Sequence, residues 1–494
     1  MNRLYYGDCL TVLNEMGVGG VDLVYLDPPF NSNRSYNAIY KDETGRPLPD
    51  QIEAFCDMWT LNEEREREIR TMPILMRESG IDDNVAQFWK TWVNALRQTH
   101  PRLLAYLSYM VTRLLAIRAV LSNTGSIYYH CDPTSSHYVK VMMDGIFGHN
   151  NFQNEIVWWY DTGGMSKSRW SRKHDTLLFY ANGKNPVFNV NDVMDEKNEN
   201  QKKRLEYAKR QGENSTYRLT STKKYPHDVW KIHAINPKAK ERMGYATQKP
   251  VELMERIIKA SSNPGDLVLD PFCGCATTLE AAQKLDRNWI GIDIAIHAVK
   301  RVASVRLRDR LGLVEGKDFT IEGVPRDVEG AADLWTRDKY HFQKWAVEQV
   351  DGFVTTRQTA DGGIDGRLYF YPPKGAELES MVIEVKGGEN LNVTDVRSLH
   401  GVLERDDAMM AGLIVLHEPK PRQAANFAKE MASAGDEIMA GVAYPRMQIL
   451  TVQQILEGQR FKTPSVAGRL ETPSKGGMKG QVPLDWTAAE NASG

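Results

Sequence analysis

Alternating apolar and polar stretches divide the chain into strand-like and helix-like segments. The apolar run Val21–Leu26 ends at Asp27-Pro28-Pro29-Phe30, and because two successive prolines cannot continue a central strand, the chain must leave its sheet there. Apolar residues recur at spacings of three and four from Leu103 to Leu121, which indicates helices across 50–121. The same pattern predicts a strand, a turn and a second strand within 1–30, and further strands at 126–130, 154–160 and 176–180.

The later part of the chain alternates regularly between helix and strand. A helix is expected from Pro250 through Ala260, then the strand 266–269, a turn, a helix from about Thr277 and the strand 289–292. This βαβ order predicts an α/β fold with a Rossmann-like, parallel, doubly wound sheet.

Composition marks three segments. A boundary near 316–326 separates the doubly wound part, 1–320, from a second, smaller α/β domain at 321–460. Residues 461–494 are rich in Gly, Pro, Ser and Thr, so a disordered tail is expected there.

Charge narrows the possible partners. The 494 residues include 62 Lys and Arg against 64 Asp and Glu, a net charge of −2, so any contact with nucleic acid must come from a local basic patch. The stretch 184–242 supplies one, with 14 Lys and Arg against 8 Asp and Glu. Aromatic residues at 207, 217, 225 and 230 are interleaved with these charges, which favours DNA contact over a merely solvated insertion.

Several protein classes are disfavoured. The five cysteines are odd in number and form no CxxC pair, which argues against a disulfide framework and against a zinc ribbon. The N-terminus has no apolar signal region, and Arg113 and Arg118 interrupt the longest apolar run. We therefore expect a cytoplasmic protein without a membrane span.

A ligand site is predicted where the strand 266–269 ends. The segment Asp270–Thr278 follows this strand and opens a helix, and ligands of open α/β sheets bind beyond the carboxyl ends of the strands. Its small residues allow the backbone to approach a ligand closely, and Asp293, at the end of the next strand, is placed to accept hydrogen bonds from ribose hydroxyls. The chain has no GxGxxG and no GxxxxGK[ST] sequence, which argues against an ATP-driven motor.

Two acidic motifs together indicate a family. Asp27-Pro28-Pro29-Phe30 after one strand, followed later in the chain by Asp270-Pro271-Phe272-Cys273-Gly274 after another, resembles the β-class amino DNA methyltransferases. The segments 6–9, 125–132 and 247–250 also match, so the resemblance covers about residues 1–310. It implies an S-adenosylmethionine site formed by Asp8, Lys249, Pro250, Asp270, Phe272, Gly274, Thr277 and Asp293. Ala276 replaces the second glycine of the family's FxGxG motif, which the turn tolerates if φ is negative there.

The resemblance also implies a reaction on duplex DNA. The Asp27 carboxylate and the Pro28 carbonyl can accept hydrogen bonds from an exocyclic amine, and Phe30 offers a flat face to a base flipped out of the duplex. No Pro-Cys dipeptide occurs, which disfavours the covalent route to C5-methylcytosine. Since the family's N4-cytosine members often carry Ser in place of the leading Asp, Asp27 favours adenine N6 over cytosine N4. A homodimer is possible.

A second group of acidic and basic residues lies in the C-terminal part. Strand alternation puts Glu384 and Lys386 on one face of a strand, where Asp365, from the preceding turn, can meet Glu384 across a hairpin. Two converging carboxylates need a cation between them, and hard oxygen ligands suit Mg²⁺. Lys386 is then placed to position or deprotonate an attacking water, the arrangement that phosphodiester hydrolysis requires.

This segment resembles the Mrr-like PD-(D/E)xK restriction endonucleases. The matching features are Gly363-Ile364-Asp365-Gly366, the ExK sequence on a strand and a preceding helix, 341–350, that carries Gln343 and Glu348. The resemblance implies a Mg²⁺-dependent endonuclease fused to the methyltransferase, a restriction–modification protein. The alternatives are a solitary methyltransferase with an inactive nuclease-fold domain, and a DNA-binding scaffold with neither activity.

Overall fold

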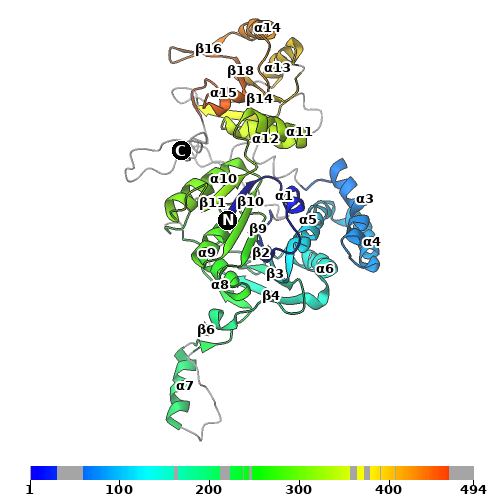
Figure 1. Ribbon diagram of the computed structural model, residues 1–494, viewed down its shortest axis with the longest axis vertical. Helices are drawn as coiled ribbons and strands as arrows, with labels where there is room; N and C mark the ends of the chain where they lie inside the picture. The colour runs from blue at the N-terminus through cyan, green and yellow to red at the C-terminus, as the bar shows by residue number, and fades with distance from the viewer. Residues whose placement is uncertain are drawn as a thin grey trace. The chain divides into compact units, whose positions relative to one another are not determined.

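The chain consists of two compact units, shown in the computed structural model of Figure 1. The first comprises Met1–Ser32, Thr60–Ile294 and Arg301–Thr320, and the second comprises Asn33–Trp59, Ala295–Lys300 and Ile321–Gly494. The structure describes residues 2–29, 59–160, 165–197, 199–211, 223–236, 239–243, 248–355, 364–371, 379–389, 391–406 and 408–466.

A nine-stranded sheet forms the centre of the first unit, in the order β11-β1-β10-β9-β2-β3-β5-β4-β8. From β1 to β3 the adjacent strands β1, β10, β9, β2 and β3 are parallel, whereas β5 runs antiparallel to both β3 and β4. The expected Rossmann-like α/β fold is confirmed. The strands are β1 (Asn2–Tyr6), β2 (Val21–Leu26), β3 (Leu121–Cys131), β4 (Phe152–Trp159), β5 (His174–Ala181), β8 (Val229–Lys231), β9 (Leu267–Asp270), β10 (Asn288–Asp293) and β11 (Phe319–Glu322).

Helices connect these strands (Figure 1). They are α1 (Cys9–Glu15), α3 (Glu63–Glu78), α4 (Asp83–Thr99), α5 (Pro101–Val120), α6 (Ser136–Phe147), α7 (Glu199–Gln211), α8 (Val251–Ser261), α9 (Thr277–Lys284) and the π-helix η4 (Val302–Arg310). Helix α10 (Ile296–Arg301) follows β10 along the chain, but its residues up to Lys300 belong to the second unit. The prediction of a turn between the first two strands is wrong. Helix α1 lies there instead, and Cys9, Val12 and Leu13, which are spaced so that they share one face of a helix, are buried.

Helix α5 is the core helix of the first unit. By length and hydropathy it could cross a membrane, but 83% of its most apolar 18-residue window is buried inside the protein. Leu104, Leu107 and Val111 are fully buried. Its apolar composition therefore reflects packing on all sides, which is typical of a helix in the interior of a large domain.

The second unit has a six-stranded mixed sheet. Its order is β12-β13-β14-β15-β18, with β19 paired to β13; β13 is antiparallel to β14, and β14, β15 and β18 are parallel. The strands are β12 (Phe353–Val354), β13 (Gly366–Tyr371), β14 (Glu379–Lys386), β15 (Met410–Val415), β18 (Met447–Thr451) and β19 (Ser465–Val466), and the helices are α11 (Val328–Arg337), α12 (Lys339–Gln349), α13 (Val393–Arg405), α14 (Pro421–Ala432) and α15 (Val452–Leu456). Leu399, Leu413 and Phe427 lie in the apolar core between α13, α14 and the sheet.

The start of the expected tail belongs to the folded unit. Phe461 is buried, and its ring lies so close to Gly412 that a Cβ there would come within 2.6 Å of it. Ser465–Val466 pair with β13 as β19. The prediction of disorder from residue 461 is therefore wrong for 461–466, because an aromatic core residue anchors them; residues 467–494 lie outside the described residues.

Candidate active site

Four carboxylates follow four neighbouring parallel strands. Asp270 and Asp293 end β9 and β10, Asp27 comes directly after β2, and Asp8 comes two residues after β1. Because β1, β10, β9 and β2 are adjacent and parallel, these four residues lie along one edge of the sheet. The structure thus brings together the acidic residues that the sequence placed in the site.

Asp27 forms an ion pair with a lysine from a distant segment. Its Oδ2 accepts a hydrogen bond from Lys249 Nζ, and the two side chains are only 15% and 13% exposed. Lys249 precedes Pro250, the buried N-cap residue of α8. Pro28 is buried beside Asp27, and Phe30 lies outside the described residues. The structure therefore places Lys249, which was expected among the cofactor ligands, against the carboxylate expected to hold the amine.

Asp270 is buried beneath the turn that follows β9. It is 3% exposed, and its Oδ1 accepts a hydrogen bond from the backbone N–H of Phe272 at 3.1 Å. The pKa of Asp270 is raised to about 7, chiefly by burial; the charges of Asp27 and Asp293 also raise it, and hydrogen bonds from Thr278 and from the N–H of Phe272 oppose the rise. Asp270 is thus a carboxyl group that carries a proton in a substantial fraction of molecules near neutral pH.

Asp293 and Ala276 determine the conformation of the turn between β9 and α9. Asp293 Oδ2 accepts a hydrogen bond from the N–H of Gly274 at 2.9 Å. Gly274 has φ +48°, and Ala276, which opens α9, has φ +56° and ψ +41°. The condition of a negative φ at Ala276 is therefore not met, because the turn needs a left-handed residue directly before Thr277. That conformation costs a non-glycine residue about 1–2 kcal/mol.

Asp8 is held by contacts within the protein. Its Oδ1 caps α1 by accepting from the N–H of Leu10 at 2.7 Å, and its Oδ2 lies 2.5 Å from Arg113 Nη2. The buried guanidinium of Arg113 stacks on Tyr109, with 3.4 Å between its Cζ and the ring centroid. Burial raises the pKa of the Cys9 thiol to about 12, so this neighbour of Asp8 stays neutral. Both Asp8 oxygens are thus engaged in positioning the loop after β1.

A hydrogen-bonded chain under Asp27 was not predicted from the sequence. Tyr25 Oη lies 2.8 Å from His130 Nδ1, and His130 Nε2 lies 3.3 Å from Asp175 Oδ2. Tyr160 Oη donates to Asp175 Oδ1 at 3.1 Å. Burial alone would raise the pKa of Asp175, but its bonds with His130 and Tyr160 and the charge of Lys249 lower it. This chain connects the strand that leads to Asp27 with β3 and β5.

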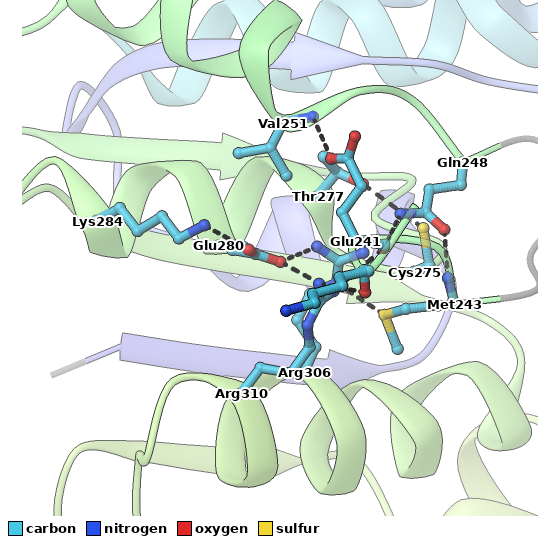
Figure 2. Close-up of polar contacts among 11 residues, drawn as sticks. Glu241, Met243, Gln248, Val251, Cys275, Thr277, Glu280, Lys284, Arg306 and Arg310 are labelled. Atoms are coloured by element: carbon cyan, nitrogen blue, oxygen red, sulfur yellow. Dashed lines mark hydrogen bonds and ion pairs between the residues drawn. The ribbon is translucent and has the colours of Figure 1, made fainter. Parts of the chain in front are cut away.

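A network of charged and polar groups stabilises helix α9, which follows the turn after β9 (Figure 2). Glu280 on α9 accepts from Lys284 at 2.6 Å and from Arg306, and Arg310 lies 3.6 Å away. Burial would raise the pKa of Glu280, but these cations hold it below its ordinary value. Arg306, which is fully buried, also donates to Met243 Sδ at 3.0 Å.

The same network holds the segment that carries Lys249. Gln248 accepts from the N–H of Met243 at 2.7 Å and donates to the carbonyl of Glu241 at 2.6 Å (Figure 2). Glu241 Oε2 accepts from the N–H of Val251 at 3.2 Å. These contacts tie 241–243 to 248–251 and, through Met243 and Arg306, to α9, which fixes the position of Lys249 beside Asp27.

Comparison with known proteins decides the family. The sequence model of the N6/N4 methyltransferase family, described as DNA methylase, matches residues 21–304, more than half of the chain. The chain belongs to this family. It is 34% identical to the type II methyltransferase M1.MboII of Moraxella bovis over 189 residues. This alignment covers 35% of this chain and 69% of that protein. It is 25% identical over 300 residues to the DNA adenine methyltransferase YhdJ of Escherichia coli K12, which covers 60% and 80%.

Two solved structures each align with about three fifths of this DNA methylase. The complex of M1.HpyAVI with SAM aligns with 18% identity and a TM-score of 0.34, covering 63% of this chain and all of that one. The cytosine-N4-specific PvuII DNA methyltransferase aligns with 17% identity and a TM-score of 0.37, covering 61% and 86%. The family match ends at residue 304, so it does not reach most of the second unit.

The second unit of this methylase brings Asp365, Glu384 and Lys386 together. Asp365 Oδ2 accepts from the N–H of Val385 at 2.7 Å, and Lys386 Nζ lies 2.6 Å from Glu384 Oε1. Burial and the charge of Asp365 raise the pKa of Glu384, although Lys386 opposes this. Within the described residues Glu384 Oε2 is buried with no hydrogen-bond partner.

This second site offers two carboxylates to a cation. In the described part of the chain no three His, Cys, Asp or Glu side chains are grouped as metal ligands. Mg²⁺ typically keeps several waters and takes one or two protein carboxylates, so Asp365 and Glu384 fit it in number and chemistry. Glu348, expected to mark the helix of this site, instead accepts from the backbone N–H of Ile296 at 3.1 Å.

Proposed function

We propose that this DNA methylase transfers a methyl group from S-adenosylmethionine to the N6 atom of adenine in duplex DNA, with 1–320 as its methyltransferase domain. The observation that carries the proposal is the pairing of Asp27 with Lys249 at the sheet edge that also holds Asp270 and Asp293. YhdJ, a relative over 60% of this chain, is a DNA adenine methyltransferase.

The residues around Asp27 suit an exocyclic amine. The lone pair of such an amine is delocalised into the base, and hydrogen bonds to the Asp27 carboxylate and the Pro28 carbonyl turn it out of the ring plane. Lys249 fixes the orientation of the carboxylate and leaves Oδ1 to accept from the amine. Bound S-adenosylmethionine supplies the electrophilic methyl group. The contribution of the protein is alignment, which is worth several kcal/mol, about 7 or more in favourable cases.

The turn after β9 fits the adenosyl donor. Cys273, Gly274, Cys275 and Ala276 are small. Cys273 N–H donates to the carbonyl of Ile292 on β10, and Gly274 N–H donates to the Asp293 carboxylate. We assign Asp270, Phe272, Gly274, Thr277 and Asp293 to this site, with Pro250 at its rim. Lys249 and Asp8 act through the partners that they hold, Asp27 and Arg113.

We propose the region 184–243 for target recognition. Its described part contains α7 and the two-stranded pair of β6 (Asp195–Glu196) and β7 (Lys223–Lys224). Tyr207 on α7 is 66% exposed and Tyr225 is 73% exposed. Exposed aromatic rings among basic residues suit contact with DNA, because bases stack on the rings while Lys and Arg bind phosphates.

Methylation sequencing of a plasmid from cells that express the chain tests the reaction. Modified adenine at a defined site is expected, and Asp27→Ala should abolish it while calorimetric binding of S-adenosylmethionine persists. Asp270→Ala should instead weaken that binding. N4-methylcytosine without N6-methyladenine would contradict the adenine assignment.

We infer a second function for the domain 321–460, a Mg²⁺-dependent DNA endonuclease. The convergence of Asp365, directly before β13, with Glu384 and Lys386 on β14 supports it. Asp365 and Glu384, whose Oε2 is buried without a hydrogen-bond partner within the described residues, would hold the cation, and Lys386 would position a water for attack on the phosphodiester. Cleavage of unmethylated and premethylated plasmid should require Mg²⁺ or Mn²⁺ and stop in Asp365→Asn, which leaves methylation intact. Absence of cleavage on both substrates, with and without S-adenosylmethionine, would favour the inactive domain.

A further inference from the structure

A loop between β4 and β5 presents an aromatic ring and several basic side chains to solvent. Trp170 is 96% exposed and Met165 is 94% exposed, so one short loop exposes two large apolar side chains, a grouping that is typical of contact surfaces. Residues 165–173 include no acidic residue, and their basic residues are Lys167, Arg169, Arg172 and Lys173. In a chain with a net charge of −2, this is a strong local concentration of positive charge.

Strand topology places this loop at the sheet edge where Asp27 lies. β3 runs parallel to β2, and β5 runs antiparallel to β3, so the start of β5 and the end of β4 meet the carboxyl end of β2 at one edge. Asp175, at the start of β5, bonds to His130, which bonds to Tyr25, two residues before Asp27. One hydrogen-bonded chain therefore connects the base of the loop to β2, the strand that leads to Asp27.

Local hydrogen bonds give the loop a defined shape. The N–H of Tyr160 donates to the carbonyl of Lys173 at 2.9 Å, which closes the base of the loop. Within it, Ser166 N–H donates to Ser171 Oγ at 3.1 Å, and Arg169 N–H donates to Ser166 Oγ at 3.3 Å. These serine contacts form a turn that leaves the neighbouring Trp170 ring exposed. The ring therefore contributes nothing to the core and is available to contact a binding partner.

We propose that the loop 165–173 is a DNA-contacting element, and that Trp170 stacks inside the duplex in the space left by the target base. The basic side chains bind flanking phosphates, which positions the loop without reading sequence. Rotating a base out of the stack costs a few kcal/mol, and an apolar side chain that fills the gap offsets this cost. The inference rests on the proposed role of Asp27, because it needs the target base to leave the duplex and reach Asp27.

Trp170→Ala tests the stacking role, with Trp170→Phe as the conservative variant. The probes are two duplex oligonucleotides carrying the site found by methylation sequencing, one fully paired and one with a mismatch opposite the target base. On paired DNA, Trp170→Ala should methylate about tenfold more slowly or worse, and Trp170→Phe should retain most activity, since any aromatic face stacks. The mismatch should restore Trp170→Ala, because a mismatched base needs little help to leave the stack.

Phe88→Ala is the matched control, since Phe88 is a half-exposed ring on α4 and its removal should leave both rates unchanged. An unchanged rate for Trp170→Ala on paired DNA, or an equal loss on the two duplexes, would overturn the stacking role. Failure of the unaltered chain to methylate any DNA would overturn the proposed function as well, so the two failures are distinguishable.

The phosphate contacts have their own measurement. Replacing Lys167, Arg169 and Arg172 by Gln should weaken binding of the paired duplex, followed by fluorescence anisotropy at several salt concentrations. The slope of log K against log salt should fall by about one for each lysine or arginine that contacts a phosphate. An unchanged slope would contradict DNA contact by this loop.

Discussion

Asp270 provides the sharpest test of the site's electrostatics. Its side chain is 3% exposed, and burial raises its pKa from 3.8 to about 7. We predict that Asp270→Asn, which keeps the shape and an oxygen to accept from the N–H of Phe272 but cannot ionise, stabilises the protein at alkaline pH and changes little in acid.

The sign and the size follow from proton linkage. Between pH 3.8 and about 7 the folded state holds a proton on Asp270 that the unfolded state has lost, so the stability due to this group declines as pH rises through that window. A shift of about three units corresponds to about 4 kcal/mol at about 1.4 kcal/mol per unit. Relative to wild type, the Asn variant should therefore gain about 4 kcal/mol between pH 4 and pH 8.

Urea unfolding of both proteins at closely spaced pH values measures this gain as a difference in the free energy of unfolding. Groups that do not interact with Asp270 titrate alike in both proteins, so their contributions cancel in the difference. If the difference in the free energy of unfolding between Asp270→Asn and wild type stayed constant from pH 4 to pH 8, the raised pKa of Asp270 would be refuted. If the variant were more stable than wild type only at acid pH, the pKa of Asp270 would be lowered rather than raised. Binding of the cationic S-adenosylmethionine favours the ionised carboxylate, so wild-type affinity should also increase through this range and that of Asp270→Asn should not.

Two further substitutions test how the site is held together. Lys249→Gln should lower the methylation rate at saturating S-adenosylmethionine about 100-fold, because Asp27 loses the partner that orients it; a change confined to cofactor affinity, measured by calorimetry, would place Lys249 with the cofactor instead. Arg306→Met should cost about 3 kcal/mol in thermal unfolding by leaving Glu280 buried with fewer cations, and adding Glu280→Gln should recover much of this loss. A double variant no more stable than Arg306→Met would contradict that account.

The parallel sheet was predictable because its strands are short apolar runs that end in acidic residues. Leu267–Asp270 and Asn288–Asp293 flank a single helix, and this local order implies parallel pairing. Helix α1 was missed because its seven residues, Cys9–Glu15, span only two turns and show too little helical periodicity. Its capping residue Asp8 was a signal that an N-cap analysis could have used.

The contacts within the site could not be predicted from local patterns. Asp27 and Lys249 are 222 residues apart, and the motifs named both residues but gave no reason for them to meet. His130 and Asp175 meet because Cys131 pairs with Thr176 across β3 and β5, and strand register depends on the whole sheet rather than on neighbouring residues. Phe30 and its expected contact with the base lie outside the described residues.

The four carboxylates along the sheet edge would repel one another if all were free and charged. Instead each is accommodated differently: Asp8 is paired with Arg113, Asp27 with Lys249, Asp293 accepts a backbone N–H, and Asp270 is kept partly neutral by burial. The edge therefore keeps enough negative charge to attract a cationic sulfonium without a large cost to folding. Because DNA is repelled by the same charge, its contacts must come from basic elements around the site, which is why we assign them to the region 184–243 and to the loop that carries Trp170.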